Sequence, residues 1–226
     1  MKKKALPKWL SNTRLSSFLQ SEIGTVASYW LFQGMLYMDV REIILKLMID
    51  AIMIIILYSI GINIIICVIL AHTFNMFFNG HYYAMKSHMG FHETTVLNFL
   101  NYVEMLQKRM SKKSYFCGAA AYGSLSRNQF KPSSDIDIRV FPKRGLINWT
   151  RTVLWVFIER LRAFLKAFPL DMYAFDMAVI DKKMRVDEPP IIFSDPEKIV
   201  AEKYPHHVPF DTFLSNFKKK HIQGND

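Results

Sequence analysis

The longest apolar run of the chain extends from residue 51 to residue 78 and contains no Asp, Glu, Lys or Arg. Its clearly polar residues do not recur at helical spacing: Ser59, Asn63, His72, Thr73 and Asn75. A helix on a soluble core normally carries a polar face, whereas a bilayer span needs roughly 20 apolar residues. The pattern therefore predicts a membrane helix over residues 51–71. The alternative is a helix buried in the core of an oligomer, so the sequence is compatible with a homo-oligomer.

The chain before this run also has features of a membrane surface. Residues 26–38 are uncharged and rich in aromatic side chains that suit a headgroup interface, but they are too few for a span. A basic start favours the cytoplasmic leaflet and is made of Lys2, Lys3, Lys4, Lys8 and Arg14. We therefore expect residues 1–90 to form an N-terminal membrane-associated helical region.

The number of membrane passes is left open by the sequence. One span over residues 51–71 would place its two flanks on opposite sides of the bilayer. An interfacial helix or a re-entrant hairpin would keep both flanks on one side.

From residue 91 to residue 226, helical and strand patterns alternate in a second domain. Apolar residues at helical spacing and short buried runs predict, in order, a helix at 93–110, a strand at 115–122, a short helix at 125–130, a strand at 135–141, a helix at 149–168 and a strand at 170–180. The remainder, from residue 181, reads as irregular or short-helical. This order predicts an α/β (α+β) domain in which helices pack on a small sheet.

Composition narrows the classes of partner. With 51% hydrophobic residues the chain is not disordered, and its net charge of +10 favours nucleotides, nucleic acid or an anionic lipid surface. Cys67 and Cys117 are too few for a disulfide framework and suit small core positions. The spacing of His72, His81 and His88 lacks the i, i+3 or i, i+4 pair of helical metal ligands, so it favours interfacial polar residues.

Candidate chemistry begins at Asp135 and Asp137, which lie one residue apart in a predicted strand. Alternate side chains share a strand face, so the two carboxylates point the same way, about 7 Å apart. Like charges held this close are tolerable when a divalent cation binds between them. The alternative interpretation makes Asp135 a turn-capping residue and Asp137 a solvent-facing partner of Arg139.

A third carboxylate is expected from a neighbouring strand. Asp171 follows Pro169 at the start of the next predicted strand and is the best placed, although it also suits a cap. Asp176 is second, because it has the opposite strand parity, and Asp181 lies at the far strand end.

Four residues are expected to bind phosphate. Gly123 allows a tight turn after the first strand, and Ser124 places a hydroxyl donor at the start of the predicted short helix, whose N–H groups would face an anion. Arg127 and Lys131 would add positive charge beside a triphosphate.

This combination resembles the signature of the DNA polymerase β-like nucleotidyltransferase superfamily: Gly-Ser, a spacer, Asp-x-Asp and a carboxylate on a later strand. Here it reads GSLSRNQFKPSSDIDIRV, followed by FPLDMYAF. The resemblance implies a small mixed sheet of the nucleotidyltransferase type and two Mg²⁺ ions, with Mn²⁺ as an alternative. It implies that Gly123 and Ser124 contact the nucleotide phosphates and that Asp135 and Asp137 bind both metals. Asp171 would bind the catalytic metal and help to deprotonate the acceptor.

One departure from the family pattern concerns the phosphate loop. Leu125-Ser126-Arg127 stands where many members have Ala-Arg-Gly, so this loop is expected to differ in detail.

The sequence therefore predicts a membrane-anchored nucleotidyltransferase with its catalytic domain on the cytoplasmic side. It would move an NMP from an NTP to a hydroxyl or phosphate acceptor, and the anchor suggests a lipid or an envelope-sugar intermediate. One alternative is an enzyme that modifies protein or RNA, as in toxin–antitoxin relatives. Another is a catalytically inactive membrane module that binds nucleotide. Nucleic acid is not the expected partner, because no recognised nucleic-acid-binding module accompanies the motif.

Overall fold

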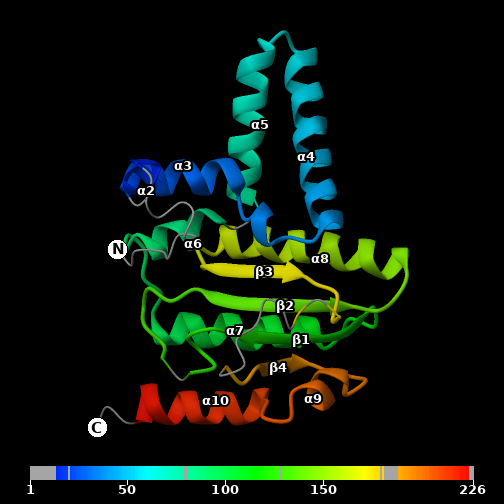
Figure 1. The fold of residues 1–226 in the computed structure, drawn as a ribbon. Helices are drawn as coiled ribbons and strands as arrows, with labels where there is room; N and C mark the ends of the chain where they lie inside the picture. The colour runs from blue at the N-terminus through cyan, green and yellow to red at the C-terminus, as the bar shows by residue number, and fades with distance from the viewer. Residues whose placement is uncertain are drawn as a thin grey trace.

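The computed structural model describes residues 14–19, 21–78, 81–127, 129–178, 180 and 188–223. Within them, five strands form one sheet in the order β3-β2-β1-β4-β5 (Figure 1). The strands are β1 (Phe116–Tyr122), β2 (Ile136–Pro142), β3 (Leu170–Ala174), β4 (Ile191–Ser194) and β5 (Val208–Pro209). The sheet is mixed, because β1 is antiparallel to β2 and β4 whereas β2–β3 and β4–β5 are parallel pairs.

The helices lie before, between and after the strands. In chain order they are α2 (Arg14–Leu19), α3 (Glu22–Phe32), the 3-10 helix η1 (Met35–Tyr37), α4 (Val40–Ser59), α5 (Ile64–Phe78), α6 (His81–His88), α7 (Val96–Met110), α8 (Leu146–Leu165), α9 (Ile199–Lys203), α10 (Phe210–Lys218) and the π-helix η3 (Lys219–Gln223). The predicted α/β arrangement, a small mixed sheet with packed helices, is confirmed.

The two faces of the sheet are covered differently. Ile136, Ile138 and Val140 of β2 belong to the main hydrophobic core together with side chains of α7 and α8. The other face carries a smaller core that includes Met38, beside η1, and Val200 of α9. The polar residues Asp137 and Arg139 of β2 alternate with the core residues and therefore lie on this second face.

Two predicted elements of the sheet domain need correction, and two strands were not predicted. The predicted helix at 125–130 is wrong: the described residues 123–127 form a turn in which Ser126 Oγ donates to the Gly123 carbonyl at 2.8 Å. The third strand ends at Ala174, where its pairing with β2 ends, and not at Ile180. Strands β4 and β5 were not predicted, because runs of four and two residues are too short to show alternation.

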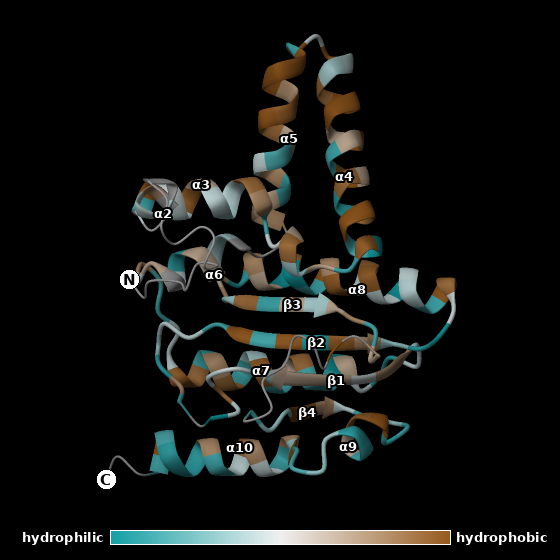
Figure 2. Cartoon of the chain, in the orientation of Figure 1, coloured by the Kyte–Doolittle hydropathy of each residue, from teal (hydrophilic) through white to brown (hydrophobic). Residues whose placement is uncertain are grey.

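The long apolar run is folded into a helical hairpin. α4 and α5 are antiparallel and project from the sheet domain, and both are strongly hydrophobic (Figures 1 and 2). The chain reverses at Gly61, where φ is +88°, and Asn63 Oδ1 accepts the N–H of Ile65 at 3.0 Å. The predicted uninterrupted helix over residues 51–71 is therefore wrong, because α4 ends at Ser59 and α5 begins at Ile64. Within the described residues, no helix is both long and apolar enough to cross a membrane.

Polar side chains of the hairpin are gathered at its foot. Asn75 Nδ2 donates to Asp50 Oδ1 at 2.8 Å, and His72 Nδ1 lies 3.2 Å from Asp50 Oδ2. Gln33 and Trp30 link this cluster to α3, because Gln33 Nε2 donates to the His72 carbonyl at 2.6 Å and Trp30 Nε1 donates to Thr73 Oγ1 at 2.9 Å. The side chains of His81, His88 and Arg14, and all of Lys2, Lys3, Lys4 and Lys8, lie outside the described part of the chain.

A buried ion pair ties the hairpin to the sheet. Glu42 of α4 pairs with Arg160 of α8, and the two side chains are 4% and 2% exposed. Glu42 Oε2 also accepts the N–H of Ala174 at 3.1 Å, and Arg160 Nε donates to the Met172 carbonyl at 2.8 Å. The pair therefore connects α4, α8 and β3.

We expect Glu42→Ala to lower the free energy of unfolding by about 3–5 kcal/mol, because it leaves the Arg160 guanidinium buried without its carboxylate. Denaturant unfolding followed by circular dichroism measures the change. The matched control is Glu104→Ala, since Glu104 pairs with Lys218 at 2.7 Å on the surface and should lose no more than about 1 kcal/mol. Equal losses in the two variants would contradict a structural role for the buried pair.

Candidate functional site

The candidate site is centred on two carboxylates in adjacent parallel strands. Asp137 of β2 and Asp171 of β3 are direct partners in the register, and their carboxyl groups are within hydrogen-bonding reach of each other. Asp135 precedes β2 by one residue and acts electrostatically on Asp137. The structure thus brings together the three carboxylates that the sequence singled out.

The neighbouring carboxylates change the pKa of Asp137. Burial, the neighbouring Asp171 and then Asp135 raise the pKa of Asp137 well above its usual value. The Arg139 guanidinium opposes this, with Nη2 3.7 Å from Asp137 Oδ1. Without a further cation, the ionised form of Asp137 is therefore disfavoured.

Arg139 lies under the carboxylates, on the same face of β2. It donates to the Asp171 carbonyl at 3.3 Å, and its guanidinium lies 4.9 Å from the centre of the Tyr173 ring. The Asp137–Arg139 pair of the alternative interpretation is thus present, but Asp137 is not simply solvent-facing, since its side chain is 30% exposed and adjoins a second carboxylate. One guanidinium offsets only one of three negative charges.

The Gly-Ser turn meets the carboxylates directly. Gly123 follows β1 with φ of +80°, and a Cβ atom at this position would lie 2.6 Å from Asp137 Oδ2. Both the backbone conformation and the close carboxylate therefore require glycine. Ser124 follows it in the turn and is half-buried, and its carbonyl accepts the N–H of Gln129 at 2.9 Å.

A glutamate that the sequence did not single out occupies the Gly-Ser turn. The Gly123 N–H donates to Glu188 Oε2 at 3.2 Å, and the Arg127 guanidinium pairs with the other oxygen, Oε1. Glu188 lies 61 residues after Arg127, so local sequence offered no signal for this contact. A carboxylate thus binds the same donors that were predicted to bind a phosphate.

The other predicted positions lie farther from this arrangement. Lys131 is exposed in the turn before β2, and its backbone N–H donates to Ser134 Oγ at 3.1 Å. Asp176 is exposed beyond β3, where its Oδ1 accepts the N–H of Ala178 at 2.9 Å. Asp181 lies outside the described residues. Asp171 is therefore the carboxylate that adjoins Asp137, in agreement with its first rank.

Tyr29 of α3 is a second residue that sequence reasoning missed. Burial raises the pKa of its phenol, and the negative charges of Asp135, Asp171 and Asp137 raise it further. The carboxylate charges thus act on a residue of α3, although more than a hundred residues separate Tyr29 from them in the sequence.

A metal ion is compatible with these residues. Among the described side chains, no group of three or more His, Cys, Asp or Glu is already arranged to hold one. The adjoining carboxyls of Asp137 and Asp171, with the raised pKa of Asp137, nevertheless form a site of excess negative charge. Mg²⁺ suits it, because this ion keeps several waters and needs only one or two protein carboxylates.

Comparison with known proteins identifies no family for this chain. No protein-family model matches the sequence, and no curated protein matches it. The functional assignment accordingly depends on the motif and on the geometry of the site.

We expect Asp137→Asn to raise the free energy of unfolding of the metal-free protein at neutral pH by roughly 1 kcal/mol, because it removes one of the repelling charges. The sign of the pH dependence follows from the raised pKa: the metal-free wild type should lose stability as pH rises from the ordinary value of 3.8 through the raised one, and the variant should not. Melting temperatures at several pH values measure this.

The same experiment with Mg²⁺ tests the metal. Added Mg²⁺ should stabilise the wild type at neutral pH and leave Asp137→Asn nearly unchanged. Asp176→Asn is the control, since its amide oxygen still caps Ala178 and it should respond to Mg²⁺ as the wild type does. A wild type that is indifferent to Mg²⁺ would exclude the predicted ion.

Proposed function

We propose that the protein is a membrane-attached, metal-dependent nucleotidyltransferase that moves an NMP from an NTP to a hydroxyl or phosphate acceptor and releases pyrophosphate. The observation that carries the proposal is the adjacency of Asp137 and Asp171 on parallel strands, with the Gly123 turn in contact with Asp137. Metal-dependent phosphoryl transfer uses clustered carboxylates as metal ligands, and hydrogen-bond donors beside them can bind the phosphates.

The carboxylates supply the metal ligands in this proposal. Asp135, Asp137 and Asp171 would hold two Mg²⁺ ions, and the chemistry supplied by bound ions would be neutralisation of the phosphate charge. Asp171 helps to take the proton of an acceptor hydroxyl. The acceptor oxygen forms a bond to the α-phosphorus while the bond to the bridging oxygen of pyrophosphate breaks.

The turn after β1 supplies the phosphate contacts. The Gly123 N–H and the Arg127 guanidinium are the two donors that Glu188 occupies, and the triphosphate takes its place. Ser124 adds a hydroxyl next to Gly123. Because residues 123–127 form a turn, the phosphate is bound by these individual donors and not by a helix N-terminus.

Membership of the DNA polymerase β-like superfamily is part of the proposal. Its support is the order of the parts along the sheet: Gly-Ser after β1, Asp-x-Asp at β2 and Asp171 in the strand next to β2. The altered loop at Leu125-Ser126-Arg127 is the main departure from the family pattern.

The apolar hairpin supports a membrane location, with the catalytic domain on the cytoplasmic side, where NTPs are found. α3 links the two parts, since it carries Tyr29 beside the carboxylates and bonds through Trp30 to Thr73 of the hairpin. An acceptor held at the membrane, such as a lipid or an envelope-sugar intermediate, would therefore reach the site.

A second candidate is a nucleotide-binding module without catalysis. Two contacts favour it. Arg139 already neutralises part of the charge of Asp137, and Glu188 already pairs with Arg127, which the proposal assigns to the phosphates. Such a module would bind an NTP but release no pyrophosphate.

We expect membranes containing the protein to transfer label from an α-labelled NTP to an acceptor in the presence of Mg²⁺. Asp137→Ala and Asp171→Asn should each lower the transfer by about 100-fold or more, which corresponds to about 2.7 kcal/mol of transition-state stabilisation. Asp176→Asn is the matched control and should transfer at the wild-type rate. Binding without transfer in the wild type would favour the second candidate, and equal transfer in wild type and Asp137→Ala would exclude the catalytic assignment.

We expect Glu188→Gln to bind an NTP about three to ten times more tightly, because the phosphate no longer competes with a carboxylate for Arg127 and Gly123. Equilibrium binding of a labelled NTP measures the change. The control is Glu197→Gln, since Glu197 pairs with Lys143 at 2.6 Å on the surface and its loss should leave binding unchanged. Weaker binding by Glu188→Gln would mean that Glu188 maintains the turn and does not compete with phosphate.

A further inference from the structure

Above its polar foot, the hairpin of α4 and α5 exposes apolar side chains on several sides. Three successive residues of α5 are exposed, namely Ile64, Ile65 and Ile66, at 48%, 67% and 50%. Successive positions on a helix point about 100° apart, so these three side chains cover much more than one face. On α4, Ile52, Ile55 and Ile56 are exposed as well.

This distribution distinguishes between two occupants. A second copy of the chain would cover one side of the hairpin and leave polar residues on the other. A helix that is apolar all round requires an apolar environment in every direction, which hydrocarbon supplies.

The polar side chains of Ser59 and Asn63 at the tip of the hairpin bond to nearby backbone, which lowers the cost of placing them in hydrocarbon. Ser59 Oγ donates to the Ile56 carbonyl at 2.7 Å, and Asn63 Oδ1 accepts the Ile65 N–H at 3.0 Å. The Asn63 carbonyl accepts the Cys67 N–H at 2.9 Å. The reversal therefore leaves these side chains bonded within the tip.

The apolar part matches one leaflet in length. Above the polar cluster of Asp50, His72 and Asn75, the segments 51–59 and 64–71 each rise about 12–14 Å. The hydrocarbon core of a bilayer is roughly 30 Å thick, so the hairpin reaches about half way through it.

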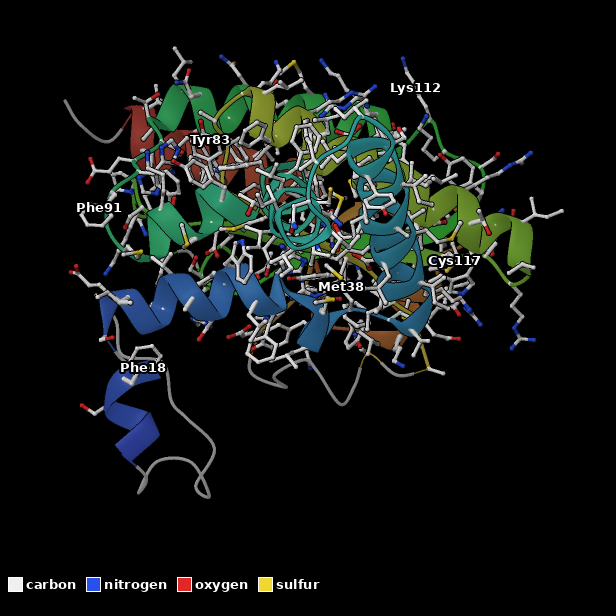
Figure 3. The ribbon with its side chains drawn as sticks, turned by 90° about the horizontal axis from the view of Figure 1, so that it is seen from above. Phe18, Met38, Tyr83, Phe91, Lys112 and Cys117 are labelled. Carbon is white, nitrogen blue, oxygen red and sulfur yellow. The ribbon has the colours of Figure 1, made fainter. Side chains whose placement is uncertain are left out.

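Two helices extend sideways from the foot of the hairpin (Figure 1). Seen from above, α3 leaves on one side and the start of α8 on the other, with Met38 between α3 and the foot of α4 (Figure 3). α3 exposes Ile23 at 74% and α8 exposes Leu146 at 77%. These side chains suit the headgroup boundary, where an amphipathic helix buries its apolar face.

The hairpin has no charged residue above Asp50, and cations lie beside aromatic rings at the start of α4 and on α6. The Arg41 guanidinium lies 4.3 Å from the centre of the Trp149 ring, at an apolar groove lined also by Met48 and Leu154. Lys86 Nζ lies 5.7 Å from the centre of the Tyr82 ring on α6. Cations beside aromatic rings at this level complement anionic headgroups.

We propose that the α4–α5 hairpin inserts into a single leaflet of an anionic bilayer, and that α3 and the start of α8 lie at its headgroup level, so that α3 and the sheet domain stay on one side. The inference specifies the membrane partner in the proposed function and rests on it for the location. It does not depend on nucleotidyl transfer.

Insertion is tested with the full chain and vesicles of phosphatidylcholine, with and without phosphatidylglycerol. Both native cysteines are buried, so the wild type is the background for a water-soluble maleimide. Ile60→Cys at the tip should be protected by anionic vesicles, whereas Glu22→Cys and Lys112→Cys, on either side of the hairpin in sequence, should both react from outside. A fluorophore on Ile60→Cys should be quenched most by lipids brominated near the end of the acyl chain.

A charge at the tip tests the surface itself. Ile65→Asp should lower the affinity for vesicles by about tenfold or more, because burying a carboxylate in hydrocarbon is unfavourable. Leu97→Asp is the matched control, since Leu97 is 63% exposed on α7, outside the hairpin, and should bind as the wild type does. Circular dichroism checks that both variants are folded.

Several results would overturn the inference. Ile60→Cys that reacts equally with and without vesicles would exclude insertion, and reaction of Glu22→Cys and Lys112→Cys from opposite sides would require a span. Protection of Ile60→Cys in a dimer without lipid would identify a second copy as the occupant. Asp137→Ala should bind vesicles normally, so that a failure of transfer and a failure of insertion are distinguished.

Discussion

The register of the parallel pair β2–β3 is the constraint on which the site depends. It places Asp137 beside Asp171, and two carboxylates in a half-buried position repel each other unless a proton or a cation lies nearby. Arg139 offsets part of that charge from below. Gly123 must lack a side chain because Asp137 fills the space that a Cβ atom would need. The chemistry that we propose thus follows from one pairing of strands.

The hairpin and the site are connected through the N-terminal helices. Glu42 of α4 bonds to the backbone of β3 at Ala174, three residues after Asp171, and pairs with Arg160. α3 contacts the hairpin through Trp30, and Tyr29 on the same helix lies in the field of the carboxylates. α3 thus contacts the hairpin and also carries a side chain that the carboxylate charges affect. In our proposal, this link is the physical reason for an acceptor held at the membrane.

The parts of the site that are close in sequence were predictable, and the parts that are distant were not. Strand alternation placed Asp135 and Asp137 on one face, and the strand after Pro169 made Asp171 the best third carboxylate. Glu188 and Tyr29 could not be found this way, because they are distant in sequence from the site residues. Glu188 bonds to Gly123, and the charges of the carboxylates act on Tyr29. The helix predicted at residues 125–130 is absent from the described residues, because Ser126 Oγ donates to the Gly123 carbonyl and the Gln129 N–H donates to the Ser124 carbonyl in a turn. Helix propensity does not reveal such bonds.

The sequence by itself determined the α/β class, the Gly-Ser and Asp-x-Asp motif and the uncharged character of residues 51–78, because each depends on residue types at short spacing. Tertiary structure decided where the apolar run reverses, since Gly61 is a single residue in a run that is apolar on both sides of it. It also decided which carboxylates adjoin each other, and that Glu188 bonds to the Gly123 N–H and to Arg127. Those outcomes depend on strand pairing and packing between distant segments, and no local pattern specifies them.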